Sequence, residues 1–84
     1  MKFYVYILRS LANGDIYIGS TDNLQERFDC HNGGKVKSTK GYRPWKLLEY
    51  EEFRTRSDAV RRERFLKNHQ QKEILKRKYG QVAK

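Results

Sequence analysis

Apolar and polar positions alternate near the start of the chain in two short segments that a turn separates. The segments cover residues 3–8 and 16–18, and both are rich in Tyr, Val and Ile. The Asn13-Gly14 pair between them supplies the positive φ angles of a tight reversal, so the pattern predicts a β-hairpin. A period of two then separates the first strand into two faces. One face carries Tyr4, Tyr6 and Leu8, and the other carries Phe3, Val5 and Ile7.

The second segment continues the same alternation. Tyr17 points away from the face that carries Ile16 and Ile18. We therefore expect Tyr6 and Tyr17 to project from neighbouring strands into one region.

The polarity then changes to a helical pattern over residues 24–32, which ends at Asn32-Gly33-Gly34. Thr21 or Asp22 is suited to cap the start of this helix. Leu24 and Phe28, four residues apart, form its apolar stripe.

Two polar residues of this helix lie beside the apolar stripe. Arg27 and His31 fall on the same side as Leu24 and Phe28, whereas the remaining polar side chains take the outer face. A cation and an imidazole are thus expected to border the buried surface.

Residues 33–44 (GGKVKSTKGYRP) are predicted to form a loop that contains three glycines and the only proline. Four basic side chains lie within it: Lys35, Lys37, Lys40 and Arg43. A basic, hydroxyl-bearing loop suits nucleic-acid phosphate contacts. An ordinary solvated loop is the alternative interpretation.

Residues 45–53 (WKLLEYEEF) predict a third strand. Strict alternation places Trp45 and Leu47, with Glu49 next in line, on one face. It places Leu48 and Tyr50 on the other. The Leu47-Leu48 pair interrupts the alternation, which indicates a bulge or burial on both faces. Together the segments predict an α/β (α+β) fold, with a small three-stranded antiparallel sheet flanked by helices.

A second helix is predicted to begin at the cap Ser57, with Asp58 in its first turn, where the helix dipole favours an acid. Glu63 falls on its apolar arc, between Val60 and Leu66. A carboxylate facing a core is costly unless it is paired or coordinated, so Glu63 indicates a functional site. The alternatives are a side chain that reaches solvent at the helix edge or one that pairs with Arg27.

The remaining pattern predicts a short helix over residues 70–79 that frays after Gly80. We expect one domain spanning residues 1–84, with its core at about 2–68.

The chain is short and strongly basic. The chain has 84 residues, of which 37% are hydrophobic, 13% aromatic and 35% charged, enough for one compact core. Its 19 Lys and Arg against 10 Asp and Glu give a net charge of +9. Such an excess favours a polyanionic partner, and nucleic acid is the first candidate. A membrane surface is the second, but no basic helix has a strongly apolar opposite face, so no membrane partner is expected. A basic protein without such a partner is the third alternative.

Cys30 is the single cysteine, so no internal disulfide can form and a reducing, cytoplasmic compartment is expected. The short apolar run at the N-terminus is interrupted by Arg9, which favours a strand over a signal peptide. Cys30, His31 and His69 lack zinc-ligand spacing.

The positions above resemble the GIY-YIG nuclease domain. Tyr4-Val5-Tyr6 stands at the first tyrosine triplet of that family and Tyr17-Ile18-Gly19 at the second, and Arg27, His31 and Glu63 follow in the family's order. The segments KSTKGYRPWKL and RSDAVRRERFLK are similar to the small stand-alone bacterial members. Related modules occur in homing endonucleases, restriction enzymes and the incision subunit of bacterial excision repair.

This resemblance implies a DNA endonuclease that acts in repair, recombination or processing. It implies that Glu63 holds Mg²⁺ (or Mn²⁺), that Arg27 contacts the scissile phosphate, and that His31 orients groups or transfers a proton. Tyr6 and Tyr17 jointly are the candidates for activating water. The chain departs from the pattern where Tyr4 replaces glycine, and where Ser20 stands at a position that carries lysine in some members.

Two further functions remain open. A catalytically weak or silent nucleic-acid binding module predicts salt-sensitive binding without cleavage. A protein-interaction or ribosome-associated factor predicts no affinity for free DNA.

Overall fold

The computed structural model describes residues 1–79 as three strands and four helical segments. In chain order they are β1 (Phe3–Ser10), β2 (Ile16–Thr21), α1 (Leu24–Asn32), the 3-10 helix η1 (Lys40–Tyr42), β3 (Trp45–Phe53), α2 (Arg56–Leu66) and α3 (His69–Tyr79). The predicted strands and helices are all present. The expected fraying after Gly80 lies outside the described residues.

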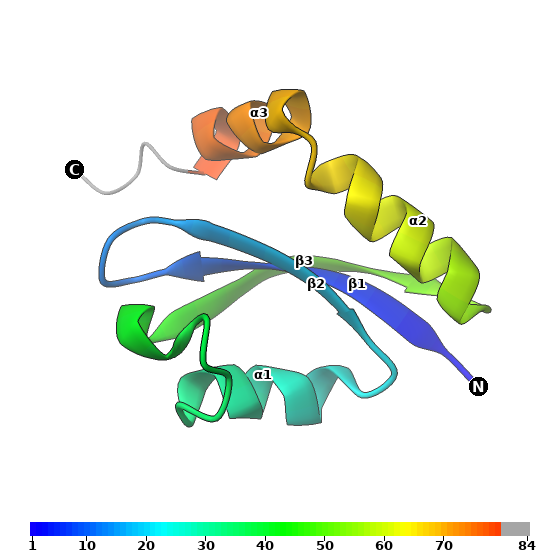
Figure 1. Cartoon of the computed structure of the whole chain (residues 1–84), viewed down its shortest axis with the longest axis horizontal. Coiled ribbons are helices and arrows are strands. Elements are labelled where there is room, and N and C mark those ends of the chain that lie inside the picture. The colour runs from blue at the N-terminus through cyan, green and yellow to red at the C-terminus, as the bar shows by residue number, and fades with distance from the viewer. Residues whose placement is uncertain (80–84) are drawn as a thin grey trace.

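The three strands form one antiparallel sheet in the order β2-β1-β3, so β2 and β3 are its edges. The helices lie on both faces: α2 and α3 on one, α1 and η1 on the other (Figure 1). This arrangement confirms the predicted α+β fold. Within the described chain, no helix is long and apolar enough to cross a membrane.

The turn between β1 and β2 is wider than a two-residue reversal. Gly14 has a positive φ of 81°, but Asn13 does not. The buried Ser10 organises the turn, because its hydroxyl accepts hydrogen bonds from the Ala12 and Asn13 amides, each at 3.1 Å. The same hydroxyl donates to the Tyr42 carbonyl at 2.6 Å and so ties the hairpin end to η1.

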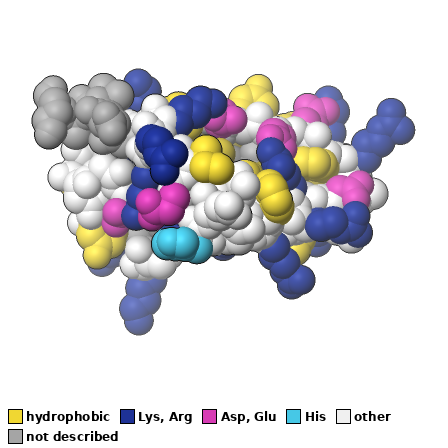
Figure 2. Space-filling view, turned by 90° about the horizontal axis from the view of Figure 1, so that it is seen from above, with side chains coloured by type: hydrophobic (Ala, Val, Ile, Leu, Met, Phe, Trp, Pro, Cys, Tyr) yellow, Lys and Arg dark blue, Asp and Glu magenta, His cyan; other side chains and the backbone are white. Residues whose placement is uncertain are grey.

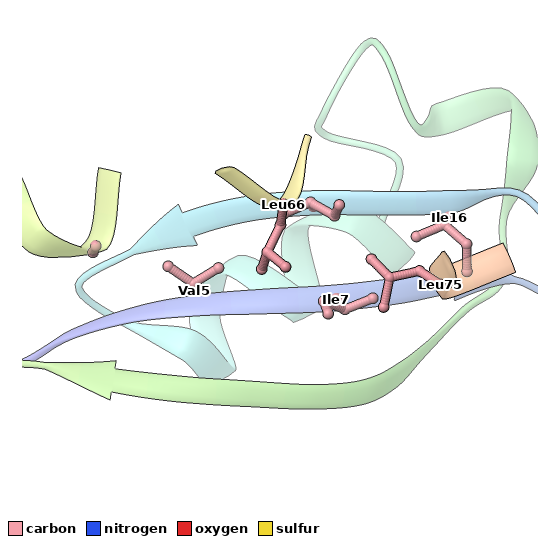
Figure 3. Packing of buried hydrophobic residues seen from close by; sticks show 7 residues of the cluster. Val5, Ile7, Ile16, Leu66 and Leu75 are labelled. Atoms are coloured by element: carbon pink, nitrogen blue, oxygen red, sulfur yellow. The ribbon is translucent and has the colours of Figure 1, made fainter. Parts of the chain in front are cut away.

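Each face of the sheet has its own core, and β1 contributes to both, as its alternation predicts. The cluster beneath α2 and α3 is aliphatic (Figure 3), and its buried members are Val5, Ile7, Ile16, Ile18, Ala59, Leu66 and Leu75. The cluster beneath α1 is largely aromatic; its members are Tyr6, Leu8 and Trp45, with Tyr17, Leu24, Phe28 and Leu47 packed against them.

The bulge suggested by Leu47-Leu48 is present, and it changes the faces of the residues that follow. Ile7 pairs with Glu49 whereas Leu8 pairs with Leu47, so Leu48 is the extra residue. Leu48 joins the aliphatic core and Leu47 the aromatic one. For the residues that follow the bulge, the faces predicted by strict alternation are wrong.

Tyr50 pairs with Tyr6 and stacks edge-on against Tyr4, so it shares the α1 face with Leu47. Glu49 lies on the opposite face, where it pairs with Lys78 of α3 at 3.7 Å. The single extra residue inverts the alternation for the second half of the strand.

The predicted N-caps were wrong by one or two residues. Asn23 caps α1, since its side chain accepts a hydrogen bond from the Glu26 amide, and neither Thr21 nor Asp22 takes this role. Thr55 caps α2 through the Asp58 amide, which places Ser57 inside the first turn. Helix α1 itself spans the predicted residues, Leu24–Asn32, whereas α2 begins at Arg56, before the predicted cap.

Truncating Leu66 should destabilise the fold strongly, whereas truncating its neighbour Phe65 should not. Leu66 is 6% exposed in the aliphatic core and Phe65 is 47% exposed on the outside of α2. Leu66→Ala should lower the free energy of unfolding by about 2–5 kcal/mol, because it leaves a cavity. Phe65→Ala should lower it by about 1 kcal/mol or less. Urea titration followed by circular dichroism measures both, and equal losses would contradict the assigned core.

Candidate active site

Tyr6 and Tyr17 lie side by side on the α1 face of the β1-β2 hairpin, as predicted. Tyr6 pairs across the strands with Gly19, and Tyr17 lies two residues before that glycine. Their ring centroids are 6.2 Å apart. Tyr6 is only 1% exposed, whereas Tyr17 is half-buried.

Gly19 allows the two phenols to pack this closely. A Cβ at this position would lie 2.6 Å from the Tyr6 hydroxyl and 3.0 Å from a ring carbon of Tyr17. Real side chains do not tolerate the first of these distances, so any larger residue would displace Tyr6. The glycine of the second triplet is therefore required by packing, and no positive φ is involved.

His31 projects from α1 into the same region and is fully buried. The hydroxyl of Tyr6 lies 2.9 Å from its Nε2, and the hydroxyl of Thr39 lies 2.8 Å from its Nδ1. The ring of Tyr17 packs against the imidazole, with centroids 4.8 Å apart. The prediction that His31 borders the buried face therefore understated its position, since the side chain has no exposed surface.

Burial and a nearby cation determine how these groups ionise. Burial, assisted by the positive charge of Arg27, lowers the pKa of His31 from 6.5 to about 4. Burial raises the pKa of Tyr6 from 10.0 to about 12, although Arg27 acts on the same hydroxyl and opposes this shift. At neutral pH the site therefore holds a neutral imidazole and a protonated phenol beside a guanidinium.

Glu63 lies on α2, across the sheet from α1. Its Oε1 accepts a hydrogen bond from the Ser20 hydroxyl at 2.6 Å, and its Oε2 lies 2.7 Å from Nζ of Lys67. Its side chain is 19% exposed, so it faces inward as its place on the apolar arc indicated. The alternative pairing with Arg27 is wrong, because Lys67 and Ser20 are the partners.

These partners keep Glu63 charged. Burial alone would raise the pKa of its carboxyl, but the hydrogen bonds from Lys67 and Ser20 outweigh burial and lower the pKa below the ordinary value. The negative charge of Glu63 in turn contributes to raising the pKa of Tyr6. The acid on α2 therefore lies close enough to Tyr6 to act electrostatically on its hydroxyl.

Sequence reasoning missed two members of this region. Lys67 follows Glu63 by one helical turn, and that spacing was a usable signal for an ion pair. Thr39 had no such signal, because its contact with His31 depends on how the 33–44 loop folds back on α1.

A single carboxylate is the donor that this region offers to a cation. Among the described residues, no three His, Cys, Asp or Glu side chains gather as a ligand cluster. Mg²⁺ commonly retains several waters and binds one or two carboxylates together with substrate phosphates. The charged, inward-facing Glu63 fits that type of site.

The basic loop lies on the α1 side of the molecule. Lys35, Lys37 and Lys40 are exposed, and the ion pairs found within residues 1–79 do not involve them. Arg43 differs, because its Nε donates to the Lys40 carbonyl at 2.8 Å and its guanidinium packs over Gly34.

The face formed by α2 and α3 has a different charge pattern. Its cations are interspersed with acids, as Figure 2 shows. Arg61 pairs with Asp58 at 3.6 Å and Arg62 with Glu51 at 3.0 Å. Part of the positive charge on this face is therefore paired with acids, whereas Lys76 and Arg77 of α3 are exposed and take part in none of the ion pairs found among the described residues.

Comparison with known proteins gives consistent matches over most of the chain. The family model described as the GIY-YIG catalytic domain matches residues 2–79. A UPF0213 protein of Staphylococcus haemolyticus is 41% identical over 76 residues, covering 89% of this chain and 92% of the relative. A UPF0213 protein of Pediococcus acidilactici is 40% identical over 77 residues, covering 88% and 78%.

A solved structure agrees with these sequence matches. The solution NMR structure of a UPF0213 protein from Bacillus halodurans is 33% identical and has a TM-score of 0.56. The match covers 98% of this chain and 89% of that one. The names of these relatives state no activity, so they support the fold and the family.

The buried imidazole should make the fold sensitive to mild acid. The folded-state pKa of His31 is about 4, whereas an unfolded histidine has a value of about 6.5. The stabilisation from keeping His31 neutral is complete above the unfolded value and is lost as pH falls from about 6.5 towards 4. The full loss is about 3 kcal/mol. Urea unfolding of the wild type at about pH 7, 5.5 and 4.5 measures it.

The matched comparison uses the two histidines of the chain. His31→Gln should remove most of the pH dependence in this window, whatever its absolute stability. His69→Gln changes an exposed histidine and should keep the wild-type dependence. If the free energy of unfolding depends on pH in the same way in the wild type and in His31→Gln, His31 is not held neutral by the fold.

Proposed function

Because this chain belongs to the GIY-YIG family, we propose that it is a divalent-metal-dependent endonuclease that hydrolyses phosphodiester bonds in DNA. The observation that best supports this proposal is the hydrogen bond between Tyr6 and the neutral, buried His31 beside Arg27. The net charge of +9 agrees with a polyanionic substrate.

In this proposal Arg27 binds the scissile phosphate. Its guanidinium is half-buried and interacts with the Tyr6 hydroxyl in the free protein, and this contact raises its own pKa. A planar guanidinium matches the oxygens of a phosphate and stabilises the charge that builds on them. When it turns from Tyr6 to the phosphate, it leaves the phenol oxygen free to accept a hydrogen bond from the attacking water.

Tyr6 and His31 then move the proton of that water. A phenol with a pKa of about 12 keeps its proton at neutral pH and is no base by itself. It accepts a proton from water if its own proton passes at the same time to Nε2 of His31, 2.9 Å away. The water becomes the nucleophile, Tyr6 is unchanged after the transfer, and His31 carries the positive charge.

Tyr17 is the more accessible of the two phenols. It is half-buried, packs against both His31 and Trp45, and forms no side-chain hydrogen bond within the described structure. Tyr6 has an acceptor for its proton and Tyr17 has none. We therefore assign the proton transfer to Tyr6 and a phosphate contact at the mouth of the site to Tyr17.

Glu63 is the residue that would hold the divalent ion. A bound Mg²⁺ or Mn²⁺ supplies charge neutralisation at the phosphate and stabilises the leaving oxygen. Ser20 orients the carboxylate through Oε1, while Lys67 neutralises Oε2 in the free protein. Lys67 must give up this ion pair, at least in part, for Glu63 to accept a second cation.

A nucleic-acid binding module with little or no activity is the second candidate function. Two observations favour this function. Both carboxylate oxygens of Glu63 already have partners, and Tyr6 is almost completely buried. If the groups packed around Tyr6 and the partners of Glu63 do not move on binding, the substrate cannot reach the phenol or the carboxylate.

Cleavage assays separate the two candidates. The wild type should nick supercoiled plasmid with Mg²⁺ or Mn²⁺ and should stop when EDTA is added. Glu63→Gln and Arg27→Ala should each lower the rate by about 100-fold or more, because each removes charge stabilisation at the phosphate. Glu26→Gln is the matched control, since Glu26 is exposed on the outer side of α1.

Parallel assays on nicked, single-stranded and branched DNA identify the preferred substrate. A wild type that binds these substrates but cleaves none of them with either metal would support the binding module instead. Wild-type rates in Glu63→Gln or Arg27→Ala would remove the assigned residues from the mechanism.

The loop cations should contribute phosphate contacts in either candidate. Replacing Lys35, Lys37 and Lys40 by Ala together should weaken DNA binding and lower the slope of log K against log salt by about 2–3. Replacing Lys72, Lys76 and Lys78 of α3 removes the same charge from the opposite side of the sheet (Figure 1) and should change the slope less. Fluorescence anisotropy of labelled duplex DNA measures both, and equal slopes would exclude the loop as the interface.

A further inference from the structure

Three buried polar side chains form a chain of contacts through the aromatic core. Tyr6, His31 and Thr39 are 1%, 0% and 1% exposed, so solvent cannot replace their hydrogen bonds. Each link is short, at 2.9 Å between Tyr6 and His31 and 2.8 Å between His31 and Thr39. The hydroxyl of Thr39 therefore connects the hydrogen-bonded pair of Tyr6 and His31 to the 33–44 loop.

The position of Thr39 is fixed by its backbone. Its carbonyl accepts a hydrogen bond from Nε1 of the buried Trp45 at 3.0 Å. Its amide donates to the Val36 carbonyl at 3.1 Å. These bonds need no threonine side chain, so the hydroxyl is free to serve His31.

The direction of the chain follows from its last acceptor. The Thr39 hydroxyl lies 3.4 Å from the Val36 carbonyl, which can only accept a hydrogen bond. When the hydroxyl donates to that carbonyl, its oxygen accepts from His31, so Nδ1 carries the imidazole proton. Nε2 is then an unprotonated acceptor and receives the hydrogen bond of the Tyr6 hydroxyl.

The opposite tautomer would block the proposed reaction. With the proton on Nε2, His31 would donate to the Tyr6 oxygen and could not take the phenol proton. The other groups that act on the imidazole are the ring of Tyr17, which packs against it, and the charged guanidinium of Arg27. Neither of them bonds Nδ1 in the described structure, which leaves Thr39 to select the tautomer.

We propose that Thr39 is a positioning residue that holds His31 in the Nδ1-protonated tautomer and thereby makes its Nε2 the acceptor for the Tyr6 proton. The catalytic consequence depends on the proposed nuclease function, whereas the tautomer itself does not. The two can therefore fail separately.

Nitrogen-15 NMR of the histidine side chains at about pH 7 tests the tautomer directly. In the full-length wild type, His31 should show a protonated Nδ1 and an unprotonated Nε2. Thr39→Val keeps the shape and removes the acceptor, so its His31 should shift towards the Nε2-protonated form. Thr39→Ser retains the hydroxyl and should keep the wild-type signals. Ser38→Ala, at an exposed position in the same loop, is the control and should also leave them unchanged.

Plasmid nicking by the same variants tests the consequence. Thr39→Val should cleave about 10- to 100-fold more slowly, by analogy with lost partners of ligand histidines, and Thr39→Ser should restore most of the rate. An Nε2-protonated His31 in the wild type, or an unchanged tautomer in a folded Thr39→Val, would overturn the proposal. If Thr39→Val does not fold, the wild-type and Thr39→Ser spectra decide it. If His31 of the wild type is protonated on Nδ1 but the protein cleaves no DNA, the positioning role of Thr39 is supported and the proposed nuclease function is rejected.

Discussion

The close contact between Tyr6 and Gly19 is the constraint on which the candidate site depends. The phenol of β1 lies directly over the glycine of β2, where a Cβ would approach its oxygen to 2.6 Å. In this packing the hydroxyl reaches His31, and the ring of Tyr17 lies against the same imidazole. The following residue, Ser20, points to the other face of the sheet and bonds Glu63. Two adjacent residues of β2, Gly19 and Ser20, thus support the parts of the site on the two faces of the sheet.

The site lies where it does because β2 is an edge strand. Helices α1 and α2 cover opposite faces of the sheet (Figure 1), so Arg27 and Glu63 are separated by the sheet itself. At an interior strand, neighbouring strands on both sides would keep such residues apart. At the edge, a phosphate bound as proposed would contact side chains from both faces. A sheet of only three strands makes that edge available within a domain of 84 residues.

Much of this arrangement could be predicted from the sequence, because it follows from local periodicity. The alternation in β1 gave the two faces, and helical spacing gave the inward positions of His31 and Glu63. The faces of Glu49 and Tyr50 could not be obtained in this way, since one bulge residue inverts the alternation after it. The contact of Thr39 with His31 was also hidden, because it depends on the tertiary path of a loop with no periodic pattern.

The two cores differ in chemistry, and the difference relates stability to function. The face under α2 and α3 is filled by aliphatic residues, whose packing stabilises the sheet without polar groups. The face under α1 is filled by Tyr6, Trp45 and their neighbours, so the residues proposed for proton transfer are also core residues. A small domain has few buried positions to divide between these tasks. Burial keeps His31 neutral and Tyr6 protonated, so the packing that stabilises this face also determines the protonation states on which the proposed chemistry depends.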